Sequence, residues 1–171
     1  MYDAGGILPD IDLKPDSLSE ITISLILKNH VFNFVTQYVR DHATIPSPDK
    51  FEFTTTEYQQ FLTYLEGREY DYKTSSELKL EELIEAMKED KYYDNSTDEI
   101  TRLQTKVGHN KQRDLELFSS EIINVIANEI VSRYYYQKGR IIFDLRYDKE
   151  VKKAVEILNN SAQYNKILSG K

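Results

Sequence analysis

The sequence contains no cysteine, which excludes disulfide bonds, thiolate metal sites and a cysteine nucleophile. Histidine is also scarce, with three residues at His30, His42 and His109. No two of them stand at the spacing that places two metal ligands on one helical face, and no H-E-x-x-H motif is present. We therefore expect surface or structural histidines, and we expect no metal and no other cofactor.

Other signatures of catalysis and of binding are missing as well. There is no G-x-S-x-G nucleophile elbow and no glycine-rich loop that could hold a phosphate. Positive charge is in the minority, and the net charge of −7 argues against a nucleic-acid partner because it repels phosphate backbones. No apolar run reaches the ~18 residues of a membrane-spanning helix. The chain of 171 residues, 40% hydrophobic and 30% charged, instead has the composition of one ordered domain.

The strongest periodic pattern lies between residues 114 and 139. Apolar side chains recur there three and four residues apart, as on one helical face. They are Phe118, Ile122, Val125, Ile126, Ile130 and Tyr134, with Leu115, Ile123 and Val131 beside them. A stripe this wide is typical of a helix covered on more than one side, so we expect a central helix roughly 37 Å long. Gly139 would end it, because glycine readily adopts the left-handed conformation that closes helices.

Further helices are indicated on both sides of this stretch. Asp16 or Ser17 can cap a first helix that ends near His42. Three capping boxes, each a Ser or Thr followed three residues later by Glu, precede apolar helical faces. They are Thr54–Glu57, Thr74–Glu77 and Ser96–Glu99. Asp148 would cap a last long helix, and its inward positions would be Val151, Ala154, Val155 and Leu158.

The predicted fold is therefore mainly α, a domain of about five to six helices. Residues 2–13 contain Gly5, Gly6 and Pro9 and do not have a helical pattern, so we expect a short extended segment there. Residues 141–143, Ile-Ile-Phe, would form either one minor strand or a second extended piece.

The most unusual local cluster is Arg-Tyr-Tyr-Tyr at residues 133–136. On a helix, its spacing buries Tyr134 and exposes the neighbouring residues, which is a purely structural role. Alternatively, the exposed tyrosines form a binding surface, since each combines an apolar ring with a hydroxyl. The carboxylates of Glu81, Glu82 and Glu85 by contrast fall on a solvated helical face and indicate no site.

Two segments resemble the C-terminal processing (tail-specific) serine peptidases, in the form found in Bacteroidetes. The catalytic core of that family closes with a motif similar to V-Y-D-G-G-G-I-x-P-D-I. The positions that match it here are Tyr2, Asp3, Gly5, Gly6, Ile7, Pro9 and Asp10, with Ala4 in place of one glycine. The helical region that follows in the family contains a run similar to residues 129–140, and Asp148, Ala154 and Leu158 continue the likeness. That run includes Arg133, Tyr134, Tyr135, Tyr136 and Gly139.

The resemblance implies that residues 1–13 are the end of a peptidase core and that residues 14–171 are a helical C-terminal domain. In that family the serine nucleophile, the lysine general base and the PDZ domain all precede the glycine motif. No residue of this chain matches either catalytic group, so we expect no peptide hydrolysis by the chain alone.

The same resemblance implies partners and a location. The partners would be the catalytic and PDZ domains of the same polypeptide, with protein C-terminal tails as substrates of the whole enzyme, in the periplasm of the cell envelope. The helical domain would brace or regulate the catalytic core. A homo-oligomer remains open, and so does the alternative of a free-standing helical protein-interaction module.

Overall fold

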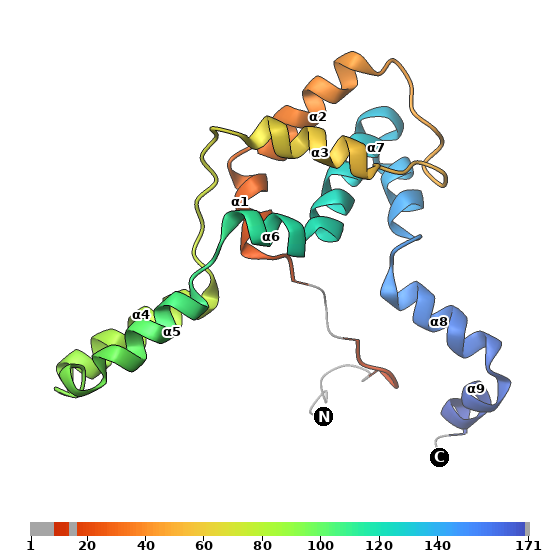
Figure 1. Ribbon diagram of the computed structural model, residues 1–171. Coiled ribbons are helices and arrows are strands. Elements are labelled where there is room, and N and C mark those ends of the chain that lie inside the picture. Colours follow the sequence, from red (N-terminus) through yellow and green to blue (C-terminus); the bar gives the residue numbers. More distant parts are fainter. Residues whose placement is uncertain (1–8, 14–16, 170–171) are drawn as a thin grey trace, which may run out of the picture.

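The computed structural model describes residues 9–13 and 17–169 (Figure 1). This part of the chain forms nine α-helices and one 3-10 helix, and it contains no strand. The α-helices are α1 (Glu20–Leu27), α2 (His30–Asp41), α3 (Thr55–Leu65), α4 (Ser75–Glu89), α5 (Thr97–Val107), α6 (Lys111–Leu117), α7 (Ser119–Asp144), α8 (Lys149–Asn159) and α9 (Ser161–Leu168), and the 3-10 helix η1 is Asp94–Ser96.

The mainly α class is as predicted, but the predicted number of helices and the predicted strand are wrong. Two segments that the periodicity presents as single helices are each broken in two, at residues 28–29 and at Phe118. The C-terminal residues add α9 as a helix of its own. The Ile-Ile-Phe run at residues 141–143 belongs to α7, and its Phe143 is buried in the core.

Helices α1, α2, α3, α6 and α7 pack around one apolar core. The centre of this core comes from α7, since Ile122, Ile126 and Ile130 have no exposed surface. α2 lies along α7 and brings Phe34, whose ring meets that of Phe61 from α3 edge-on at 5.0 Å. Each such fully buried side chain stabilises the fold by roughly 1.5–3 kcal/mol. The predicted burial of the long apolar stripe is confirmed at its centre.

A turn at Asn29 separates α1 from α2. Its backbone is left-handed, with φ of 61°, a conformation that asparagine tolerates better than most residues. The helix before it begins later than predicted, because the side chain of Ser19 accepts a hydrogen bond from the Thr22 amide. The turn changes the phase of the apolar pattern, so Val35 is buried whereas Phe32 is 50% exposed.

Two of the three predicted capping boxes are confirmed. In each, the threonine hydroxyl accepts a hydrogen bond from the glutamate amide, and the glutamate carboxylate accepts one from the threonine amide; the pairs are Thr54–Glu57 and Thr74–Glu77. The third box is wrong. Ser96 makes no capping hydrogen bond, because it closes the 3-10 helix that runs directly into α5.

The central helix α7 does not end at Gly139 as predicted. Instead it reverses at Tyr136, whose φ of 55° and ψ of −157° are not helical, and it continues to Asp144. The segment after the reversal lies back against the first part, since the Asn128 amide donates a hydrogen bond to the Asp144 carboxylate. Arg140 adds a longer contact to Asp144 at 3.7 Å.

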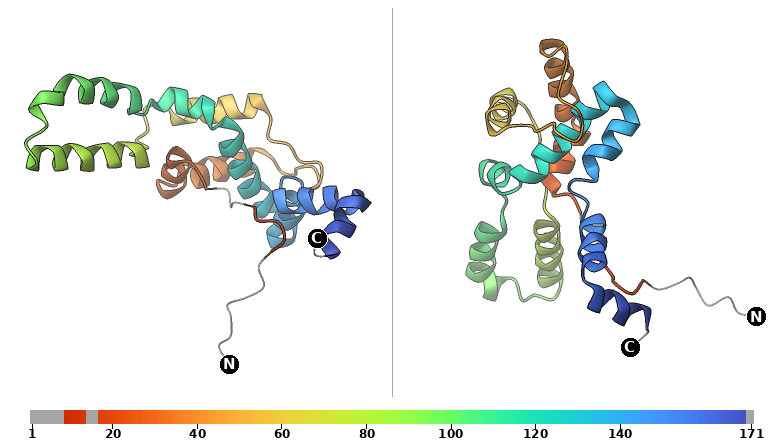
Figure 2. Two further views of the ribbon diagram at one scale, coloured as in Figure 1. Left: turned by 90° about the horizontal axis from the view of Figure 1, so that it is seen from below. Right: turned by 90° about the vertical axis from the view of Figure 1, so that its right-hand side faces the viewer.

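α4 and α5 form a helical hairpin, which we call the arm, and it projects away from the core (Figures 1 and 2). The arm has an apolar cluster of its own, built from buried Leu80, Ile84 and Ile100. Helices α8 and α9 project at the other end of the described chain (Figure 2). Asp148 caps α8 as predicted, by accepting hydrogen bonds from the amides of Glu150 and Val151.

The predicted inward face of α8 is exposed. No residue of α8 or α9 is buried, and Val155 and Leu158 are 51% and 65% exposed. The periodicity of the sequence thus predicted an apolar stripe correctly, but the described residues do not cover it. No helix in the described ranges has both the length and the apolar character that crossing a membrane requires.

Candidate functional site

The positions taken from the glycine motif lie at the start of the chain. Pro9 and Asp10 are exposed. The other motif positions are outside the described residues, so the end of a peptidase core at residues 1–13 stays a prediction; they are Tyr2, Asp3, Gly5, Gly6 and Ile7.

The tyrosine cluster ties α7 to the connection between α2 and α3. The hydroxyl of Tyr134 donates a hydrogen bond to the carbonyl oxygen of His42, and that of Tyr135 donates one to the carbonyl oxygen of Ile45 at 3.0 Å. Tyr134 is half-buried, and burial raises the pKa of its hydroxyl. These two tyrosines therefore fix the path of a connection that has no helix of its own.

Tyr136 and Gly139 shape the reversal of α7. Tyr136 is 78% exposed and holds a positive φ, a conformation that costs a non-glycine residue on the order of 1–3 kcal/mol. Gly139 is buried, and a Cβ atom there would lie 2.1 Å from the Cβ of Tyr135 and 3.3 Å from Pro48. Glycine is required at this position because the two parts of α7 approach too closely for any side chain.

Arg133 completes the cluster on the other face of α7. Its guanidinium pairs with Glu129 at 2.7 Å and lies over the ring of Phe32, 4.5 Å from the ring centre. The stacking covers part of the apolar ring that the turn at Asn29 leaves outside the core. Arg133, Tyr134 and Tyr135 thus make contacts within the domain. Tyr136, by contrast, is exposed to solvent.

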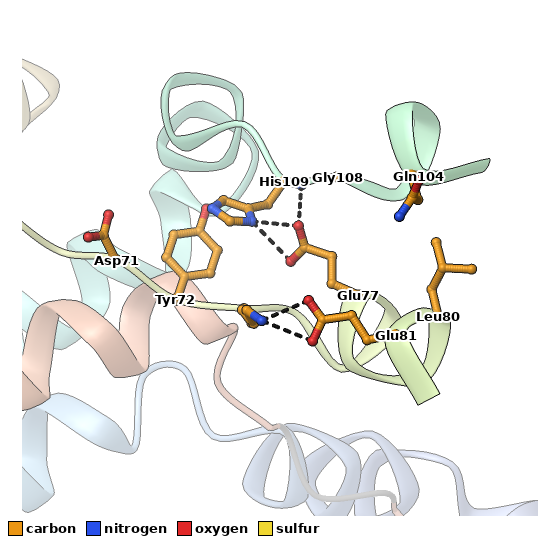
Figure 3. Close-up of a pocket in the computed structure, with 9 residues that line it drawn as sticks. Asp71, Tyr72, Glu77, Leu80, Glu81, Gln104, Gly108 and His109 are labelled. Atoms are coloured by element: carbon orange, nitrogen blue, oxygen red, sulfur yellow. Dashed lines mark hydrogen bonds and ion pairs between the residues drawn. The ribbon is translucent and has the colours of Figure 1, made fainter. Parts of the chain in front are cut away.

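A second polar cluster lies at the base of the arm, where the chain enters α4 and leaves α5 (Figure 3). A pocket of about 590 Å³ opens there beside Tyr72, Glu77, Glu81 and His109. The carboxylate of Glu77 accepts hydrogen bonds from both the amide and Nδ1 of His109, at 3.0 and 2.7 Å. Because Glu77 also closes the capping box with Thr74, one carboxylate joins the start of α4 to the turn after α5.

Neighbouring groups extend this cluster. The hydroxyl of Tyr72 donates a hydrogen bond to Asp114 at 2.6 Å, and its ring lies 4.3 Å from the imidazole of His109. Lys73 forms an ion pair with Glu81 at 2.7 Å. Tyr72 therefore ties the base of the arm to α6.

The electrostatics of the cluster follow from these contacts. Burial alone would raise the pKa of Glu77, but the hydrogen bonds from Thr74 and His109 outweigh it and lower the pKa to about 2. Burial raises the pKa of Tyr72, and the hydrogen bond to Asp114 raises it further. Glu77 is thus ionised and Tyr72 neutral at neutral pH, which is the state that keeps all of these hydrogen bonds.

The carboxylates at the base of the arm accept hydrogen bonds from a neighbouring hydroxyl, a backbone amide and an imidazole. A lysine base needs a desolvated amine, whereas the ion pairs made by Lys73, Lys88, Lys111 and Lys153 leave these side chains at least 31% exposed. Within residues 9–13 and 17–169, no group of three or more metal-binding side chains is close enough to hold an ion.

The role of Glu77 at the base of the arm goes beyond what the sequence indicates. The capping box identifies Glu77 as a partner of Thr74. Glu81, four residues after Glu77, belongs to the solvated face of the same helix. The second partner, His109, is 32 residues away, and no local pattern joins the two. The Gly108–His109 pair does mark a break between helices, and the structure has α5 end at Val107.

Comparison with protein families gives one match. The family model described as "Probable PDZ-protease, C-terminal helical domain" matches residues 21–158. No curated protein and no solved structure matches the chain. The matched range begins within α1, includes both polar clusters described above, and reaches the end of α8.

Proposed function

Because the chain belongs to the family of C-terminal helical domains of probable PDZ-proteases, we propose that it braces the catalytic core of a C-terminal processing serine peptidase. The observation that carries the proposal is the family match over residues 21–158. In this role the domain does not cleave peptides itself. It packs beside the catalytic and PDZ domains of the same polypeptide and holds them in their working arrangement.

The form of the domain supports a bracing role. One apolar core makes a rigid centre, and two helical pairs, the arm and α8–α9, project from it. The arm is fixed at its base by the Glu77 and Tyr72 hydrogen bonds. Projecting units on a rigid centre suit contacts with neighbouring domains.

The chemistry of the whole enzyme forms part of the same proposal. The resemblance of residues 2–10 and 129–140 to the tail-specific peptidases supports a serine nucleophile and a lysine base in the preceding domains. It also supports protein C-terminal tails as substrates and the periplasm as the location. The tyrosine cluster that carries the second half of the resemblance shapes the reversal of α7, so it supports the fold of the domain and not the chemistry.

The test compares three proteins on unstructured tail peptides, with cleavage followed by mass spectrometry. We expect the full-length peptidase to shorten the peptides, the chain of 171 residues to leave them intact, and the peptidase lacking residues 21–158 to cleave more slowly. Cleavage by the 171-residue chain that survives repurification would contradict the proposal. Undiminished cleavage by the shortened peptidase would contradict the bracing role.

A further inference from the structure

Exposed apolar side chains are concentrated in the last part of the described chain. Of the 19 large apolar residues that are exposed in residues 9–13 and 17–169, eight lie between residues 141 and 168. They are Ile141, Leu145, Tyr147, Val151, Val155, Leu158, Tyr164 and Leu168. Apolar surface gathered in this way is typical of an interaction site.

Five of these residues lie on α8 and α9. Val151, Val155 and Leu158 are four and three residues apart and therefore share one helical face. Tyr164 and Leu168, four residues apart, likewise share one face of α9. We call these five residues the α8–α9 stripe.

The α8–α9 stripe differs from the exposed residues of the arm. The arm is also a helical pair, but Leu80, Ile84 and Ile100 are buried between its helices, so it has a small core of its own. α8 packs against α9 and buries no residue at all. A pair of short helices without a buried side chain gains little stability from its own packing, so the stripe requires a cover from outside the described residues.

The charge of this part of the chain and the position of residues 9–13 indicate which surface covers the stripe. Lys and Arg outnumber Asp and Glu by nine to four between residues 133 and 171, although the whole chain has a net charge of −7. Residues 149–168, which form α8 and α9, contain four lysines and two glutamates, and one of the glutamates, Glu156, pairs with Lys153. The excess of lysine favours a matching surface that is apolar at its centre and acidic at its rim. Residues 9–13, which precede the family-matched range, lie near α8 and α9 in all three views (Figures 1 and 2). The domains that precede the helical domain in the same polypeptide are therefore directed to this side.

We infer that the α8–α9 stripe is the docking surface for the protease part of the same polypeptide, which covers it with an apolar patch rimmed by carboxylates. The inference rests on the proposed function and adds to it the surface through which the core is braced. It also explains why the predicted inward face of α8 is exposed in the 171-residue chain.

The test uses cysteine labelling, for which the domain offers an empty background because it has no cysteine. Val155→Cys and Leu158→Cys place a thiol in the stripe, and Leu117→Cys, 64% exposed at the end of α6 and outside both projecting pairs, is the matched control. Each variant is made in the 171-residue chain and in the full-length peptidase, and labelling by a maleimide is located by peptide mass spectrometry. We expect all three thiols to react at similar rates in the 171-residue chain. In the full-length peptidase the two stripe thiols should react at least about tenfold more slowly, and the control should not change.

Three results would overturn the inference. Equal labelling in both proteins would show that the protease part leaves the stripe open. Protection in the 171-residue chain that grows with its concentration would make a second copy the cover, and protection that requires added anionic vesicles would make it a membrane surface. The proposed function is judged separately: if deletion of residues 21–158 slows cleavage while the stripe stays open, bracing stands and the docking surface lies elsewhere.

Discussion

Replacing Glu77 with glutamine should weaken the base of the arm in a way that depends on pH. The Glu77 side chain is 18% exposed, and its pKa falls on folding from 4.5 to about 2. A carboxyl group whose pKa is lowered by folding stabilises the folded state above its unfolded pKa, and this contribution is lost as the pH falls toward the folded value. With these two pKa values, the contribution lost between pH 6 and pH 3 is ~2 kcal/mol.

The assay is urea unfolding followed by far-UV circular dichroism, at pH 6 and at pH 3, for the wild-type chain and Glu77→Gln. The difference in unfolding free energy between the two proteins should narrow by ~2 kcal/mol at the lower pH. Glu81→Gln is the matched control on the same helix, because its exposed ion pair with Lys73 contributes no more than about 1 kcal/mol. A difference between the wild-type chain and Glu77→Gln that is the same at both pH values would refute the reasoning.

Four further substitutions test the fold by urea unfolding. Ile126→Ala should cost roughly 2–5 kcal/mol, because Ile126 is fully buried at the centre of the core; a cost under 1 kcal/mol would be incompatible with that position. Thr74→Ala should cost ~1 kcal/mol, whereas Ser96→Ala should stay within ~0.5 kcal/mol since Ser96 caps no helix; equal costs would contradict the assignment. Tyr136→Gly should stabilise the chain by ~1 kcal/mol, because glycine adopts the backbone conformation of this exposed residue without strain; a loss of stability would argue against the reversal there.

The features that the sequence predicts well are local ones. The capping boxes at Thr54 and Thr74 involve residues three apart, and the cap at Asp148 is equally short in range. The apolar period likewise identifies Ile122, Ile126 and Ile130 as core residues. Such signals depend on neighbours along the chain, and tertiary packing agrees with them here.

The breaks and reversals depend on contacts that the sequence does not display. Asn29 interrupts a regular apolar period, which by itself predicts one continuous helix. Tyr136 is a residue type that avoids positive φ, and the reversal is held by contacts such as Tyr135 to Ile45 and Asn128 to Asp144. Glycine at position 139 resembles a helix stop, yet it serves close packing.

The base of the arm and the α8–α9 stripe are two further features that the sequence predicts only in part. Glu77 meets His109 across 32 residues, so its second role becomes visible only in three dimensions. Val155 and Leu158 have the period of a covered face, but periodicity predicts that a face is apolar and not which surface covers it. From the sequence alone, the surface that covers this face of α8 is therefore wrongly expected inside the domain.

Calorimetric unfolding of the full-length peptidase, with and without residues 21–158, tests the central claim most directly. If the helical domain braces the catalytic core, the transition of the catalytic part should move to a lower temperature when the domain is removed, because the contacts that the domain supplies are lost. A catalytic part that unfolds at the same temperature and with the same enthalpy in both proteins would contradict the bracing role.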